Sequence, residues 1–206
     1  MPDLVYENEL FQKGFNAIAG IDEAGRGSLA GPVVAACVVV GPDFTAREGL
    51  LLINDSKKLS AKKREDLFSL IKDEFGDVAV GIADNEEIDR LNILQATFLA
   101  MRRALSGLRA EPDFVLVDGN IEIPAIALRQ RAIIKGDSLV FSIAVASIIA
   151  KVARDRLMEE YDKDFPGYGF IKHKGYGTKE HLARLRELGP ARIHRRSFEP
   201  IKSMVF

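Results

Sequence analysis

Cysteine is nearly absent from this chain of 206 residues, which contains only Cys37, inside an apolar run. One thiol cannot form an intramolecular disulfide, which is typical of a reducing, intracellular compartment. No uncharged apolar stretch approaches the ~20 residues that a membrane span needs. The longest, Val33 to Val40, has the length of a strand. The N-terminus also lacks a basic region followed by an apolar one, so no secretory signal is seen. We therefore expect a soluble cytoplasmic protein.

Internal repeats, low-complexity linkers and His/Cys clusters with zinc spacing are also missing. About half of the chain (47%) is hydrophobic, enough for a substantial core in one compact domain with a small appendage. We place the main domain at residues 1–170 and a basic, helical C-terminal segment with a tail at 171–206.

Charge is unevenly distributed although the net charge is only −1. Residues 172–206 carry nine Lys/Arg, three Asp/Glu and all three histidines, whereas the remainder has 20 basic and 27 acidic residues. A basic segment beside an acidic body suits a nucleic-acid surface next to a cation site. On charge alone, a solvated basic helix and tail is an equally good interpretation.

The hydrophobic pattern predicts an α/β protein with a mixed central sheet flanked by helices. Apolar, β-branched runs indicate strands, and apolar residues spaced three or four apart indicate helices. We expect strands at 17–22, 33–40, 78–83, 114–117 and 132–134, and helices at 60–75, 86–108 (broken near Asn92), 139–161 and 178–188.

Four carboxylates follow apolar, strand-like runs: Asp22, Glu23, Asp118 and Asp137. In open α/β sheets, ligands bind at the carboxyl ends of strands, and crowded carboxylates need a cation or a proton between them. Mg²⁺ and Mn²⁺ prefer hard oxygen ligands, and two such ions about 4 Å apart can promote hydrolysis of a phosphodiester. Each acid taken singly could equally be a turn or cap residue, and spacing does not prove that the four converge.

The segment from Gly25 to Ala30 matches the dinucleotide-binding pattern G-x-G-x-x-A after a strand. That motif should open a helix whose N-terminus receives a pyrophosphate. Here Gly31-Pro32 and a β-branched run follow instead, and Asp22 and Glu23 would repel a diphosphate. The glycines more plausibly let backbone N–H groups approach a ligand closely.

Several motifs, in this order along the chain, resemble those of type 2 ribonuclease H (ribonuclease HII). They are the Gly20–Gly27 and Leu29–Ala36 stretches, Asn54–Leu59, Val117–Gly119, Lys135–Asp137, Ala146–Asp155, Gly175–Thr178 and Arg196–Phe198. One departure is Ser28, where proline is expected; we expect it to change the stiffness of the loop rather than the chemistry.

The resemblance implies a ribonuclease H-like fold with a mixed central sheet and a small helical C-terminal part. It implies an endonuclease that cleaves the RNA strand of RNA–DNA hybrids and incises 5′ of a ribonucleotide embedded in duplex DNA, leaving 3′-hydroxyl and 5′-phosphate ends. Asp22, Glu23, Asp118 and Asp137 would then be metal-binding catalytic residues for two Mg²⁺ or Mn²⁺ ions, with Asp22 bridging them.

The resemblance also implies how the substrate is read. Gly25, Arg26 and Gly27 would contact the 2′-hydroxyl through backbone groups, and Tyr176 would pack on the neighbouring deoxyribose. Tyr176 as a loop anchor and Arg26 as a surface ion pair are the competing interpretations. Five further residues are candidate contacts to phosphates: Lys57, Lys58, Ser147, Lys151 and Lys174.

Two other functions remain open at this point. A junction resolvase of the same fold would share the metal site, but it would not need the ribose-reading residues. A non-catalytic nucleic-acid-binding module would have no use for four acids that are costly to bury. We expect a monomer whose partners are nucleic-acid duplexes, and we expect the histidines to be structural or to touch phosphate weakly.

Overall fold

A five-stranded mixed sheet forms the centre of the protein in the computed structural model, which describes residues 1–45, 50, 53 and 60–204. The strand order is β3-β2-β1-β4-β5, with β1 antiparallel to β2, β2 antiparallel to β3, and β4 parallel to both β1 and β5. The strands are β1 (Ile18–Ala24), β2 (Val33–Val40), β3 (Val78–Ala83), β4 (Phe114–Asp118) and β5 (Arg129–Ile133).

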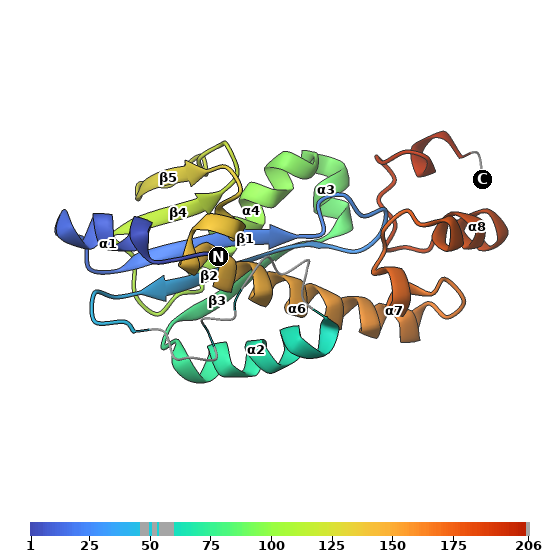
Figure 1. Cartoon of the computed structure of the whole chain (residues 1–206). Coiled ribbons are helices and arrows are strands. Elements are labelled where there is room, and N and C mark those ends of the chain that lie inside the picture. The colour runs from blue at the N-terminus through green and yellow to red at the C-terminus, as the bar shows by residue number, and fades with distance from the viewer. Residues whose placement is uncertain (46–49, 51–52, 54–59, 205–206) are drawn as a thin grey trace.

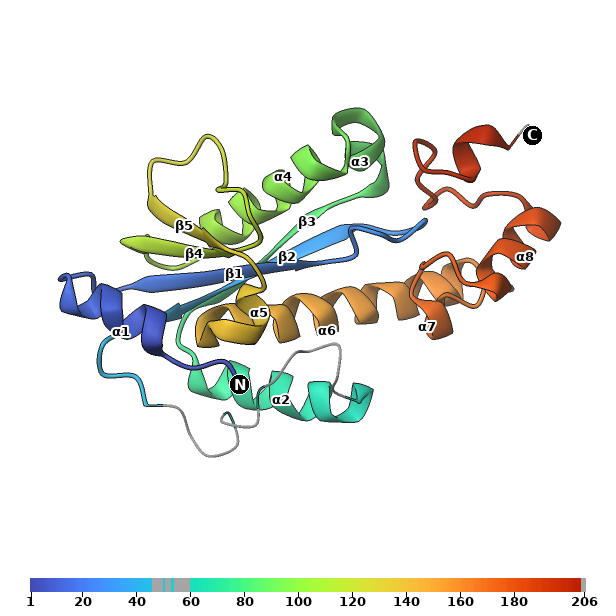
Figure 2. The ribbon, with the colours of Figure 1, turned by 45° about the horizontal axis from the view of Figure 1, so that its top comes forward.

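Helices cover both faces of this sheet, as Figures 1 and 2 show. α3 and α4 lie on one face, and α2 and α6 lie on the other, so the domain has three layers. The helices are α1 (Val5–Gln12), α2 (Ala61–Glu74), α3 (Asn85–Leu91), α4 (Ile93–Ser106), α5 (Gly136–Leu139), α6 (Phe141–Asp164), α7 (Phe170–His173) and α8 (Lys179–Leu188), followed by a 3-10 turn at Ile201–Ser203.

Strand β2 shows why the sheet needs both helical layers. Its alternate residues divide between two cores: Val33, Ala35 and Cys37 pack toward α4, whereas Ala36 and Val38 pack toward α2 and α6. Successive side chains of a strand point to opposite faces, so an unbroken apolar run is buried on both sides. No helix among the described residues is both long and apolar enough to cross a membrane.

The predicted order of elements is confirmed, including Ser60 as the N-cap of α2 and the break between α3 and α4 at Asn92. The short helices α1, α5 and α7 were not predicted. Two boundaries were wrong. β1 continues through the acidic pair to Ala24, so Asp22 and Glu23 lie within the strand. β5 begins at Arg129, and Asp137 lies in the one-turn helix α5 instead of directly after a strand.

Helix α6 is fixed near its N-terminus by one contact with α1 and one with β1. The Glu7 carboxylate, fully buried on α1, accepts a hydrogen bond of 2.8 Å from the backbone N–H of Ser142. Gly20 of β1 allows close contact, because a Cβ there would lie 2.3 Å from the Ser142 carbonyl carbon. An acid at a helix N-terminus satisfies an N–H that the helix leaves unpaired. These contacts fix the position of α6 against β1. They thereby also place Ser147, whose side chain is hydrogen-bonded to Asp22, two residues after Gly20.

Candidate active site

Asp22 and Asp118 are brought together by the parallel pairing of β1 and β4. Ile21 lies opposite Val117 in the register, so the next residue of each strand is an aspartate on the same face. Asp22 is almost completely buried and Asp118 is half-buried. The two carboxylates therefore lie side by side toward the carboxyl ends of these parallel strands, which confirms that these two acids converge.

The buried position of Asp22 makes its charge costly. Burial raises the pKa of Asp22 well above its usual range, and the nearby carboxylates of Glu23 and Asp118 raise it further. A hydrogen bond with the Ser147 side chain and another from the Glu23 backbone N–H, at 2.7 Å, act in the opposite direction. We call Asp22, Glu23 and Asp118 the acidic cluster.

Glu23 forms the border between two adjoining hollows of the surface. It lines a small one, of about 50 Å³, with Asp118 and residues of α4, and also a larger one, of about 220 Å³, with Ser147 and Tyr176. Its Oε1 lies 3.2 Å from Nη1 of Arg26, whose side chain is half exposed. The surface ion pair considered for Arg26 is therefore present.

Asp137, in α5, lies next to Asp118. It is buried, and its backbone N–H donates a hydrogen bond of 3.3 Å to Oδ1 of Asp118. Gly136 permits this approach, because a Cβ at that position would lie 3.2 Å from the same oxygen. One carboxylate oxygen of Asp137 accepts from the Ser138 hydroxyl at 3.2 Å. Asp137 therefore borders the acidic cluster through its backbone.

The acidic cluster suits a hard divalent cation by its chemistry. Its donors are carboxylate oxygens, and a cation would offset the repulsion that raises the pKa of Asp22. Across the described residues, no three His, Cys, Asp or Glu side chains are arranged to hold a metal ion on their own. Mg²⁺ normally keeps several waters and takes one or two protein carboxylates plus substrate phosphates. The residues therefore fit an ion whose coordination the substrate helps to complete.

The larger hollow gathers most of the predicted substrate contacts. It is lined by Glu23 and Ala24 and by six of those residues: Gly25, Arg26, Gly27, Ser147, Lys151 and Tyr176. They come from the turn after β1, from α6 and from the loop before α8, segments that are far apart in the sequence. Tyr176 is 39% exposed, so its ring is accessible from outside.

The predicted lysines differ in their surroundings. Lys151 lines the larger hollow and pairs with Asp155; burial lowers the pKa of Lys151, and Asp155 partly offsets this. Lys174 is absent from that lining and forms an ion pair of 2.7 Å with Glu159. Lys57 and Lys58 lie outside the described residues.

Two residues that the sequence did not single out, Arg154 and Arg195, lie directly behind the Gly25–Gly27 turn. Arg195 donates to the carbonyl oxygens of Gly25 and Arg26, and Arg154 donates to the hydroxyl of Ser28 at 2.7 Å. Helical spacing offered a signal for Arg154, because it lies seven residues after Ser147 on the same face of α6. No comparable signal marks Arg195, since sequence patterns do not identify a buried charge in a loop.

Ser28 contributes a polar group rather than only changing the stiffness of its loop. Its buried hydroxyl donates 2.9 Å to the carbonyl of Gly25 while it accepts from Arg154. Proline at this position would remove that hydroxyl and its two hydrogen bonds. The expectation for Ser28 was therefore incomplete.

The three histidines form a buried cluster under the Tyr176 loop. The rings of His173 and His181 stack at 4.4 Å, and Nε2 of His181 lies 3.0 Å from Nε2 of His194. Nδ1 of His181 contacts the carbonyl oxygen of Tyr176 at 3.0 Å. Burial lowers the pKa of both His181 and His194 to about 4. The histidines are structural, as expected, and they support the loop that carries Tyr176.

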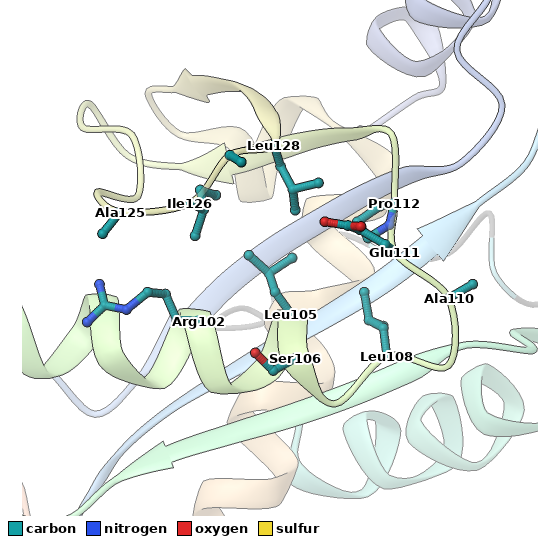
Figure 3. A pocket seen from close by; sticks show the side chains of 11 residues that line it. Arg102, Leu105, Ser106, Leu108, Ala110, Glu111, Pro112, Ala125, Ile126 and Leu128 are labelled. Atoms are coloured by element: carbon teal, nitrogen blue, oxygen red, sulfur yellow. The ribbon is translucent and has the colours of Figure 1, made fainter.

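A cavity of about 400 Å³, larger than either hollow, lies elsewhere (Figure 3). It lies between the end of α4 and the loop from β4 to β5, and Leu105, Ile126 and Leu128 form much of its wall. None of the predicted site residues lines it. Cavity size is therefore no guide to where the predicted site residues gather.

Comparisons with known proteins agree with this geometry. The family model described as "Ribonuclease HII" matches residues 19–201. The ribonuclease HII of Geobacter metallireducens is 55% identical over 97% of this chain and 92% of its own length. That of Clostridioides difficile is 54% identical over 94% of this chain and 74% of its own length. The crystal structure of ribonuclease H2 from Pyrococcus horikoshii superposes with a TM-score of 0.73 at 29% identity, covering 91% of this chain and 96% of that one.

Proposed function

This chain belongs to the ribonuclease HII family, and from that membership we propose how its own residues carry out the reaction. The protein is a metal-dependent endonuclease that acts on RNA–DNA hybrids. We propose that it also incises 5′ of a single ribonucleotide in duplex DNA and leaves 3′-hydroxyl and 5′-phosphate ends.

The crowding of the acidic cluster is the observation that supports this proposal most directly. Asp22 and Asp118 lie side by side in the sheet, Glu23 borders them, and the pKa of Asp22 is raised by burial and by the other two carboxylates. We assign the metal-binding and catalytic roles to these three residues and to Asp137. Mg²⁺ or Mn²⁺ bound there would lower the pKa of an attacking water and stabilise the leaving 3′ oxygen.

The protein's own groups position the substrate around that cluster. Ser147 orients Asp22 by a side-chain hydrogen bond, and the N–H of Asp137 orients Asp118. Arg26 holds Glu23 in an exposed ion pair, which can exchange when a phosphate approaches. Lys151, at the edge of the larger hollow, is placed to contact the phosphate backbone.

The larger hollow is our proposed site for reading the sugar. Gly25, Arg26 and Gly27 line it and would offer backbone N–H groups, and the accessible ring of Tyr176 lines it as well. The 2′-hydroxyl distinguishes RNA from DNA, so this is where the enzyme would recognise a ribonucleotide. These recognition residues favour a ribonuclease over a junction resolvase of the same fold.

Cleavage assays on matched duplexes test the proposal. One duplex contains a single ribonucleotide, the second is all DNA, and a four-way DNA junction is the third. With Mg²⁺ or Mn²⁺, we expect incision only of the first, on the 5′ side of the ribonucleotide, and no cleavage after the metal is chelated. Equal cleavage of the first two substrates, or preference for the junction, would contradict the proposed specificity.

Three further points extend the proposal. We propose that the chain acts as a monomer, because the acidic cluster and the larger hollow are both formed within one chain. We propose a cytoplasmic location, based on the single buried cysteine. Residues 171–206, with their basic balance, would lie along the duplex beside the main domain of residues 1–170.

A further inference from the structure

Arg154 and Arg195 are both fully buried, which is unusual for arginine. Within the described part of the chain, no carboxylate forms an ion pair with either side chain. Burial, followed by the neighbouring charge of Arg154, lowers the pKa of Arg195 to about 9. Burying unpaired charge is costly unless hydrogen bonds compensate it. The question is therefore which groups of the protein these two buried guanidinium groups bind.

Backbone carbonyl oxygens of the turn after β1 provide that compensation. Arg195 donates three hydrogen bonds: 2.6 Å to Gly25, 2.8 Å to Arg26 and 3.0 Å to Gly31. Its planar fork therefore binds two consecutive carbonyls and the far end of the same loop. We call Arg154 and Arg195 the arginine clamp.

Arg154 completes the clamp from the α6 side. It donates to the carbonyls of Ala30, Pro32 and Lys174, at 3.2, 3.0 and 2.9 Å respectively. Its guanidinium carbon lies 5.5 Å from the centre of the Tyr176 ring. The clamp thus ties the glycine turn to the loop that carries the tyrosine.

The contacts of Arg195 determine where the turn's N–H groups point. In a trans peptide unit the C=O and the following N–H point in opposite directions. Because the carbonyls of Gly25 and Arg26 face Arg195, the N–H groups of Arg26 and Gly27 face away from it. Within the described residues neither N–H donates to a protein acceptor. The larger hollow is lined by the turn but not by Arg195, so it lies on the side to which these donors point.

We propose that Arg195 is a positioning residue for sugar recognition, which fixes two peptide planes so that the Arg26 and Gly27 N–H groups meet a ribose 2′-hydroxyl oxygen. The inference rests on the proposed function, because it assumes that the larger hollow receives the ribonucleotide. Donors held in place before binding need no reorganisation when the hydroxyl arrives. A deoxyribose lacks that acceptor, so the same groups discriminate against DNA.

Arg195→Lys is the test variant, because lysine keeps the charge but cannot reproduce the planar fork. Affinity is measured without divalent metal, so that no cleavage occurs, for a duplex with one ribonucleotide and for the same all-DNA duplex. We expect the ratio of the two affinities to fall by about fivefold or more, while all-DNA binding stays within about twofold. Ile71→Val, a buried core change in α2, is the control for lost stability and should leave the ratio unchanged.

A second measurement uses the unaltered protein, and it tests the role of the Arg26 and Gly27 N–H groups even if Arg195→Lys does not fold. The ¹H–¹⁵N resonances of Arg26 and Gly27 should shift when the ribonucleotide duplex is added, and much less with all-DNA. Equal shifts would assign the two donors to a phosphate and overturn the inference.

The outcomes separate this inference from the proposed function on which it rests. An unchanged affinity ratio in Arg195→Lys, or an equal loss in Ile71→Val, would overturn the role of Arg195 while ribonucleotide recognition stands. A ratio of one in the unaltered protein would overturn ribonucleotide recognition itself, and the inference with it.

Discussion

The acidic cluster and the arginine clamp flank the same turn, and they accommodate buried charge in different ways. Asp22, beside two further carboxylates, has a pKa raised by burial and repulsion. The arginines donate to backbone oxygens on all sides and need no external partner. The acidic cluster thus carries a repulsion that a cation from outside would offset, whereas the turn after β1 is held in place by the protein's own side chains.

Removing one acid should have the largest effect. We expect Asp118→Asn to reduce cleavage of the ribonucleotide-containing duplex by about 10³-fold or more, because it removes a group of the reacting centre. The thermal midpoint should not fall, since one source of repulsion on Asp22 is lost. Steady-state kinetics and thermal unfolding measure the two effects.

Glu111→Gln is the matched control for Asp118→Asn. It also replaces one carboxylate by an amide, but at the cavity of Figure 3, away from the predicted site. Its activity should equal that of the unaltered protein. Substantial turnover in Asp118→Asn would remove Asp118 from the reacting centre.

Gly27→Ala tests the recognition side without disturbing the fold. A Cβ at Gly27 would meet no protein atom within 4 Å, and its φ does not require glycine, so stability should be unchanged. The methyl group would nevertheless stand where the sugar approaches. We expect the rate of cleavage at a ribonucleotide to fall by about a hundredfold, because displacing a substrate by about 1 Å typically costs that much in rate.

Gly76→Ala provides the control, because a Cβ there also meets nothing within 4 Å. It should alter neither activity nor stability appreciably. If Gly27→Ala cleaves at the native rate, the proposal that the substrate closely approaches the turn is wrong.

Tyr176→Ala should have a smaller and more selective effect. We expect discrimination at an RNA–DNA junction to drop about tenfold, because aromatic packing on a nucleotide contributes about 1–3 kcal/mol. Metal binding should not change. Tyr176→Phe keeps the ring and should retain most of the discrimination; a junction preference that survives in Tyr176→Ala would refute the role.

The smallest expected effect is that of low pH, which should lower the free energy of unfolding through His181 and His194. His181 and His194 have a pKa of about 4 in the folded protein, because they are buried, and about 6.5 when unfolded. The unfolded chain therefore binds more protons between these values, and the free energy of unfolding should fall by about 1–3 kcal/mol from pH 6.5 to 4.

Urea unfolding across this pH range measures the change, with His181→Asn as the comparison whose slope should be shallower. No dependence above pH 4 would show that burial does not lower the pKa of the two imidazoles in the folded protein.

Much of the fold could be predicted because its signals are local. The apolar run of β2, the cap at Ser60 and the break at Asn92 each follow from neighbouring residues. α1 was missed because its stability comes from contacts such as that of Glu7 with the start of α6, 135 residues away. The extension of β1 through Asp22 and Glu23 was missed because acids are poor strand formers unless pairing with β2 holds them.

The chemical types at the site could be recognised in the sequence: carboxylates that follow apolar runs, a glycine turn and a tyrosine between two glycines. The tertiary structure alone decided which of them meet. Strand register placed Asp22 beside Asp118, and the buried Arg195 binds the carbonyl oxygens of both Gly25 and Arg26. The reason is physical: periodicity reports on residues three or four positions apart, whereas strand register and buried charge depend on contacts between residues about a hundred or more positions apart.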